Sequence, residues 1–251
     1  VVANGLGLEE GLKSAMDSAE QDGATVIEVA PLLDPMPMAE GAGHDHGHDH
    51  GDEGHDDHGD DGHGDDGHGH DHGAGALDPH VWFDATRMAR GAELIAARLD
   101  EVTGTDAYTD CGKAVAEELR GVDAEVRDIL AEVPPGSRVL ITDHDAFGYF
   151  AAAYDFEVAD VVIPSISTLA EPSSEHLAQL VGVIKETGVP AIFGNTARSD
   201  QLLETLSAEA GRPVQVVPLY VGSLGPEGSG AQDYPSMMRE NATLIANALS
   251  Q

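Results

Sequence analysis

The histidines of this chain fall into two groups that could bind metal in different ways. Ten of the 13 histidines lie between residues 44 and 72, interspersed with eleven carboxylates and with glycines. Imidazole suits zinc, copper and nickel, and carboxylate suits harder cations. Such a tract binds metal without a fixed geometry, so we interpret it as an accessory metal-binding loop. Its histidines are His44, His46, His48, His50, His55, His58, His63, His68, His70 and His72.

His144 is a stronger candidate for a defined metal site. It ends a predicted strand, 138–144, and precedes a predicted helix, 146–154. Ligands of parallel sheets bind beyond the carboxyl ends of the strands. The flanking Asp143 and Asp145 could orient an imidazole by accepting its second ring proton. We therefore predict that His144 is a metal ligand.

His80 is the second candidate, in the segment DPHVWFD just before a predicted helix. Pro79 restricts the backbone there, and Trp82 and Phe83 supply an apolar wall. His176 lies in the first turn of another predicted helix, and we interpret it as a surface residue. Two histidines do not complete a zinc site, which has four ligands or three and a water. The carboxylates are too abundant for composition to identify the others.

The elements that must position these residues follow from hydrophobic periodicity. Apolar spacing predicts a helix over 8–20, a strand over 25–30, a helix that Asp84 caps and Gly104 ends, and a helix over 106–132. The last would be about 40 Å long and could connect two lobes. From residue 134 onward strands (138–144, 158–164, 191–195, 213–219) alternate with helices (146–154, 173–187, 199–210, 233–249). That order predicts a mainly parallel sheet with helices on both faces.

The predicted fold class is therefore α/β, with two lobes of mainly parallel sheet flanked by helices and joined by a long rigid helix. The lobes are 1–104 and 134–251, and the connecting helix is 105–133. Residues 41–75 are predicted to be a disordered loop, because Gly, Asp and His bury no apolar surface. The opening VVANGLGLEEGL resembles the end of a strand, so we expect the first lobe to be incomplete and any export signal to lie upstream.

Composition excludes some classes of function. The formal net charge is −34, which disfavours nucleic acid as a partner. No stretch approaches the roughly 20 apolar residues that span a bilayer. The single cysteine, Cys111, forms no internal disulfide and has polar neighbours, so we interpret it as a passive thiol.

Several motifs together resemble the metal-binding solute-binding proteins of ABC importers, in particular the zinc-uptake branch. NGLGLE, DPHVWFD, TDHDAFGYFA, ISTLAEPS and DYPSMMREN occur in family order between residues 4 and 241. The resemblance implies an extracytoplasmic, monomeric, non-enzymatic protein that holds one divalent metal in an interlobe cleft and delivers it to a membrane permease. It also implies that His80 and His144 are metal ligands.

Two departures from the family pattern concern the ligands. The family's first histidine lies upstream of NGLGLE, so this chain does not include it. The family's acidic ligand corresponds to Gly222; a water, Glu227 or Asp233 could substitute, although neither carboxylate matches the family position. With the upstream histidine added to His80 and His144, the site would have three imidazoles and one open position. Such a site would suit Zn²⁺ better than manganese, with other divalent transition metals possible.

Two other functions stay open at this point. A metal storage or buffering protein would act mainly through the histidine tract. A zinc hydrolase would use an open metal position to activate water, but the sequence has no HExxH motif and no evident general base beside His80 or His144. Capture of zinc for transport is the function that we expect.

Overall fold

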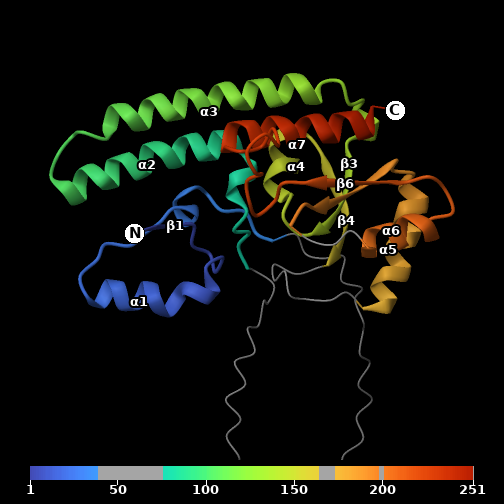
Figure 1. The fold of residues 1–251 in the computed structure, drawn as a ribbon, viewed down its shortest axis with the longest axis horizontal. Helices are drawn as coiled ribbons and strands as arrows, with labels where there is room; N and C mark the ends of the chain where they lie inside the picture. Colours follow the sequence, from blue (N-terminus) through green and yellow to red (C-terminus); the bar gives the residue numbers. More distant parts are fainter. Residues whose placement is uncertain (39–75, 164–172, 198–200, 251) are drawn as a thin grey trace, which may run out of the picture.

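The computed structural model describes residues 1–38, 76–163, 173–197 and 201–250. The predicted loop 41–75, with its ten histidines, and most of the ISTLAEPS motif lie outside these residues. Within them, helices cover both faces of a parallel sheet, and the two ends of the described chain lie on opposite sides of the molecule (Figure 1).

Four strands form the larger sheet. They are β3 (Val139–His144), β4 (Glu157–Ile163), β5 (Ala191–Asn195) and β6 (Gln215–Leu219). Their order is β4-β3-β5-β6 and every pair is parallel. The helices that alternate with them are α4 (Gly148–Tyr154), α5 (Ser174–Thr187), α6 (Gln201–Glu209) and α7 (Tyr234–Leu249). The predicted α/β alternation is therefore confirmed.

The two faces of this sheet pack into separate cores. Successive side chains of a strand point to opposite faces. In β3, Leu140 joins the larger core with residues of α4 and α7, whereas Ile141 joins the smaller core with residues of α5 and α6. Strand β3 is thus covered by helices on both faces.

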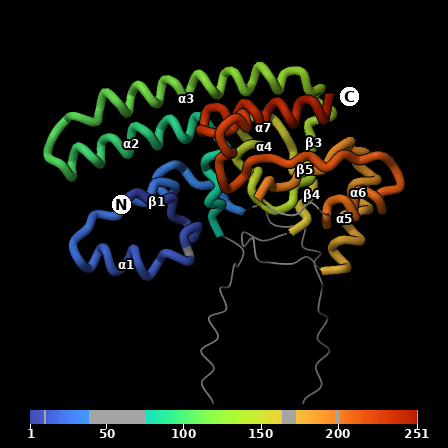
Figure 2. The backbone as a smooth tube through the Cα atoms, viewed as in Figure 1, coloured from blue at the N-terminus to red at the C-terminus, as the bar shows by residue number. Residues whose placement is uncertain are grey.

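Helices α2 (Ala85–Thr103) and α3 (Thr109–Leu130) lie side by side and continue into a layer with α7 (Figures 1 and 2). As predicted, the Asp84 side chain caps α2, and Gly104, with a φ of +67°, ends it. Helix α3 has 22 residues and is about 33 Å long, a little shorter than predicted. Among the described helices, none has both the length and the apolar character to cross a membrane.

The N-terminal segment is less regular. Strand β1 (Val2–Ala3) pairs in parallel with β2 (Ile27–Glu28), and α1 (Lys13–Gln21) follows a short 3₁₀ turn, η1 (Glu10–Leu12). The prediction that this helix begins near Leu8 was wrong, and no residue of α1 is buried. The remaining 3₁₀ turns are η2 (Ala30–Leu32), η3 (Val81–Phe83) and η4 (Pro135–Ser137).

Residues from both predicted lobes share the larger core. Leu33 and Phe83 belong to it together with Phe147 and Met238. The rings of Phe83 and Phe147 stack with centroids 4.5 Å apart. The segment that carries His80 therefore packs directly on the helix that follows His144, while the division into two lobes stays a prediction.

Candidate metal centre

His144 is the last residue of β3 and is 2% exposed. Its Nδ1 atom lies 2.8 Å from Oδ1 of Asp143, and the Thr142 hydroxyl donates to its carbonyl at 3.0 Å. A carboxylate oxygen accepts, so Nδ1 carries the proton and Nε2 keeps its lone pair for a metal. Asp143 thus orients His144 as the sequence predicted.

The ring of His80 also has an aspartate at Nδ1, but His80 lies in a loop before η3 and not at the end of a strand. It is 3% exposed, and Oδ1 of Asp78 lies 2.7 Å from its Nδ1 and 2.8 Å from its backbone nitrogen. The second contact is the Asx turn that aspartate forms with a residue two positions later. The sequence analysis did not single out Asp78, although an Asp two positions before a histidine, with proline between them, favours this turn.

The structure brings the two imidazoles together. Their centroids lie 5.6 Å apart with an angle of 66° between the planes, and the indole of Trp82 lies against His80 at 5.1 Å. Two imidazoles that share one tetrahedral zinc, each about 2.1 Å from it, hold their ring centres roughly 5 Å apart. The pair is therefore close to the spacing that one metal ion requires.

The surroundings of the pair are buried and acidic. Asp78, Asp143 and Asp145 are 2%, 6% and 8% exposed. Burial, reinforced by the charge of Asp78, raises the pKa of Asp145 to about 6, against the opposing effect of His80 and His144. Oδ2 of Asp143 is buried without a hydrogen-bond partner among the described residues. Buried carboxylate oxygens of this kind favour a cation beside them.

The described residues do not complete a metal site by themselves. Within them no group of three or more His, Cys, Asp or Glu side chains is placed to hold an ion. Gly222 is exposed, and a Cβ added there would meet no other atom within 4 Å. Asp233 caps α7 through Ser236, whose hydrogen bonds lower the pKa of that carboxyl. Glu227 lies exposed in a turn.

The sequence analysis discussed two further residues, His176 and Cys111. His176 is half-buried, and its Nε2 lies 2.6 Å from the carbonyl oxygen of Val161 in β4. This partial burial does not contradict the interpretation of His176 as a surface residue, and its ring ties the first turn of α5 to the sheet. Cys111 is a free, exposed thiol on α3.

Sequence reasoning missed the residues that fix the loop around His80. The Trp82 indole donates to the carbonyl of Val221 at 3.0 Å, and the side chain of Asn241 bonds to both the N–H and the C=O of Tyr220. These contacts join the His80 loop to the segment that precedes Gly222. Asn241 belongs to the DYPSMMREN motif, so the sequence analysis identified the motif but not the hydrogen bonds of Asn241 to Tyr220.

Comparison with known proteins places these features in one family. The family model ZnuA, described as "Zinc-uptake complex component A periplasmic", matches residues 1–248. The manganese-binding lipoprotein MntA of Halalkalibacterium halodurans is 26% identical over 250 residues, which are 99% of this chain and 71% of that protein. The zinc-binding protein TroA of Treponema pallidum is 32% identical over 180 residues, 69% of this chain and 58% of that protein. The chain thus spans little more than half the length of some relatives.

Comparison with solved structures points to the same family. The periplasmic zinc-binding protein TroA from Treponema pallidum superposes with a TM-score of 0.73 at 25% identity, over 100% of this chain and 80% of that chain. The fold is therefore TroA-like, with parallel sheets flanked by helices. None of these relatives is described as a storage protein, so the storage alternative gains no support.

Proposed function

This chain belongs to the ZnuA family of metal-binding substrate-binding proteins of ABC transporters, and we propose that it captures zinc outside the cytoplasm and delivers it to a membrane permease. The family consists of transport proteins and not of enzymes. One observation carries the proposal: two buried imidazoles, each held at Nδ1 by an aspartate, lie 5.6 Å apart at the end of a parallel strand.

In this account His80 and His144 bind the ion through Nε2. Asp78 and Asp143 fix the ring orientations and increase the basicity of the ligand nitrogens. Asp145 adds a third buried carboxyl close to the site. Because the described residues supply only two nitrogen ligands, the other ligands come from groups that do not belong to this cluster.

Zinc is the cargo that we propose over manganese. The relatives carry both metals in their names: MntA of Halalkalibacterium halodurans is manganese-binding and TroA of Treponema pallidum is zinc-binding. Manganese prefers oxygen ligands, whereas two imidazoles with protonated Nδ1 atoms suit zinc. Nitrogen and oxygen sites in general bind zinc more tightly than manganese, so affinity alone does not decide this point. Metal accumulation by cells that carry the wild-type chain, measured at limiting zinc and at limiting manganese, decides it, and restored uptake of manganese without zinc would contradict the choice.

We assign an accessory role to the histidine tract. The ten histidines of residues 44–72 would add zinc-binding groups to the chain and increase the amount of zinc that it captures. Each imidazole must be neutral to bind a metal, so this capture should weaken below about pH 6.

Delivery is tested by uptake. Cells that lack the gene are supplied with wild-type protein, His144→Ala or His176→Gln, and zinc accumulation is measured at limiting zinc. We expect uptake with wild type and His176→Gln and none with His144→Ala, because a glutamine amide can still donate to the Val161 carbonyl. Full uptake with His144→Ala would contradict the proposed function.

A further inference from the structure

The loop that carries His80 is held by side chains from three distant parts of the chain. The Tyr149 hydroxyl donates to the carbonyl of Asp78 at 2.8 Å, and the Asn4 amide donates to the carbonyl of Pro79 at 2.9 Å. The Tyr234 hydroxyl donates to the carbonyl of Trp82 at 2.8 Å. These donors are 71, 75 and 152 residues away from their acceptors in sequence. The loop therefore takes its conformation from tertiary contacts.

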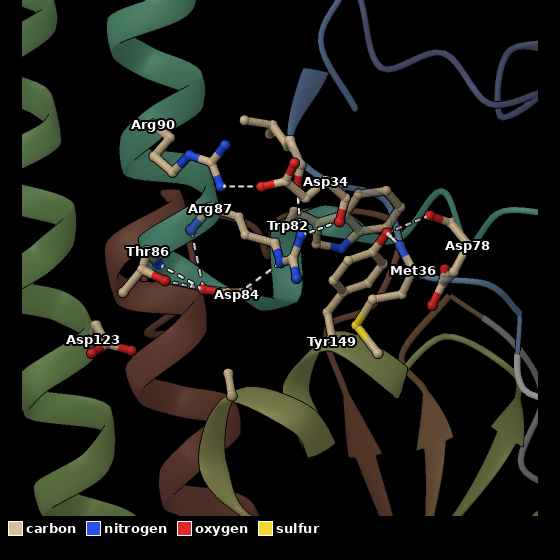
Figure 3. Close-up of polar contacts among 12 residues, drawn as sticks. Asp34, Met36, Asp78, Trp82, Asp84, Thr86, Arg87, Arg90, Asp123 and Tyr149 are labelled. Carbon is tan, nitrogen blue, oxygen red and sulfur yellow. Dashed lines mark hydrogen bonds and ion pairs between the residues drawn. The ribbon is translucent and has the colours of Figure 1, made fainter. Parts of the chain in front are cut away.

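Tyr149 differs from the other two donors because it lies on α4, directly after the strand that ends in His144. Its side chain is 1% exposed, and its hydroxyl also accepts the backbone N–H of Met36 at 2.9 Å. The guanidinium of Arg87 lies over its ring, 5.0 Å from the centroid. Figure 3 shows the Tyr149 hydroxyl between Met36 and Asp78. Both hydrogen-bonding functions of the hydroxyl are thus used.

The neighbouring Gly148 brings α4 against the same aspartate. A Cβ at this position would lie 3.1 Å from Oδ2 of Asp78. The other carboxylate oxygen of Asp78 holds the ring and backbone of His80. A continuous series of contacts therefore runs from the end of the His144 strand through Tyr149 and Asp78 to His80.

We propose that Tyr149 is a positioning residue that sets the His80 imidazole relative to the His144 imidazole, and through that spacing sets the affinity and geometry of the metal site. The inference rests on the proposed function, since it concerns the same two ligands. It adds a residue that touches neither ligand. Loss of its hydroxyl would release the Asp78 carbonyl and the Met36 N–H, and the aspartate that aims His80 would no longer be fixed to α4.

The test uses Tyr149→Phe in the whole chain, with Tyr154→Phe as the matched control. The first variant keeps the ring and its contact with Arg87. The second removes, from the same helix, a buried hydroxyl that has no hydrogen-bond partner among the described residues. Zn²⁺ affinity is measured by competition with a chromophoric chelator, and the defined site is the tight phase that His144→Ala removes.

We expect Tyr149→Phe to weaken the tight phase roughly tenfold, the size of effect that outer groups have on metal affinity. Tyr154→Phe should leave the affinity within about twofold of wild type, because no bond to the ligand loop is lost. At saturating Co²⁺, the absorption spectrum that depends on His144 should change in Tyr149→Phe only. A general loss of stability would not alter the spectrum of the folded, loaded protein.

Gly148→Ala is a second variant that keeps the hydroxyl and crowds Asp78. It should produce a similar change in the Co²⁺ spectrum, and it tests the coupling if Tyr149→Phe does not fold. Wild-type affinity and spectrum in the folded variants would overturn the role of Tyr149 while leaving the proposed function intact. A wild-type chain without a tight phase that depends on His144 would instead overturn both.

Discussion

One oxygen of Asp78 accepts two hydrogen bonds from His80, from the backbone nitrogen at 2.8 Å and from ring Nδ1 at 2.7 Å. The same carboxylate therefore shapes the loop and orients the ring. His144 has only the second of these contacts, from Asp143 at 2.8 Å. The orientation of His80 thus depends more on its aspartate than the orientation of His144 does.

Asp78→Asn should weaken zinc binding at the defined site by roughly tenfold. The amide oxygen can still accept both hydrogen bonds, but the charge that makes the imidazole more basic is gone. Chelator competition at neutral pH measures the change. The control is Asp34→Asn, an exposed aspartate that pairs with Arg90, with a φ of +51° that asparagine tolerates (Figure 3). Equal affinities for the two variants would contradict this role of Asp78.

Phe147→Ala should lower the free energy of unfolding by about 3–5 kcal/mol, the usual cost of removing a buried phenylalanine. The ring is 1% exposed and stacks on Phe83, which lies three residues after His80. Urea unfolding in the presence of a chelator measures the loss. Val115→Ala on α3, where the side chain is 38% exposed, should change stability by less than about 0.5 kcal/mol. A similar small change for Phe147→Ala would show that the stacked pair contributes little to stability.

Asp233→Ala should destabilise α7 and the Tyr234 contact that follows it. Hydrogen bonds from Ser236 lower the pKa of Asp233 in the folded chain. A lowered pKa means that the stabilisation is present above the ordinary carboxyl pKa and is lost as the pH falls through the lowered value. The difference in unfolding free energy between wild type and Asp233→Ala should therefore be larger at pH 7 than at about pH 2.

Asp233→Asn is the control for this prediction, since asparagine caps helices but does not titrate. The unfolding free energy of Asp233→Asn should exceed that of Asp233→Ala by an amount that does not depend on pH. A wild-type advantage that stays constant from neutral to acid pH would mean that the charge of Asp233 contributes nothing to the cap.

Removal of residues 44–72 should leave the tight zinc phase in place and eliminate most of the weak binding, because the ten histidines of the tract lie in that range. Equilibrium dialysis against zinc gives the number of ions bound before and after the deletion. Zinc uptake at limiting zinc should also fall. Unchanged uptake would contradict the capture role, and loss of the tight phase would revive the storage interpretation.

Local sequence patterns were sufficient to predict most of the regular elements. Asp84 and Gly104 indicated the ends of α2, and the strand-helix alternation after residue 134 predicted the parallel sheet. Apolar periodicity failed for the predicted helix 8–20, where Leu12, just before α1, is 60% exposed and no residue of α1 is buried. Periodicity states which residues share a face of a helix, but it does not state whether another element covers that face.

The site was only partly predictable for a related reason. Asp143 is adjacent to His144, so its contact could be inferred from the sequence. Asn4, Tyr149 and Tyr234 contact the His80 loop from positions at least 71 residues away. Such contacts depend on the packing of whole elements, and no local spacing indicates them.

We propose that His80 and His144 hold a single ion. Zinc titration of the whole chain by competition calorimetry, on wild type and on His80→Ala, His144→Ala and His176→Gln, tests this proposal most directly. We predict one tight phase in wild type and in His176→Gln, and its loss in each of the other two variants with the weak binding of the tract retained. An unchanged tight phase in His80→Ala or in His144→Ala would contradict the assignment.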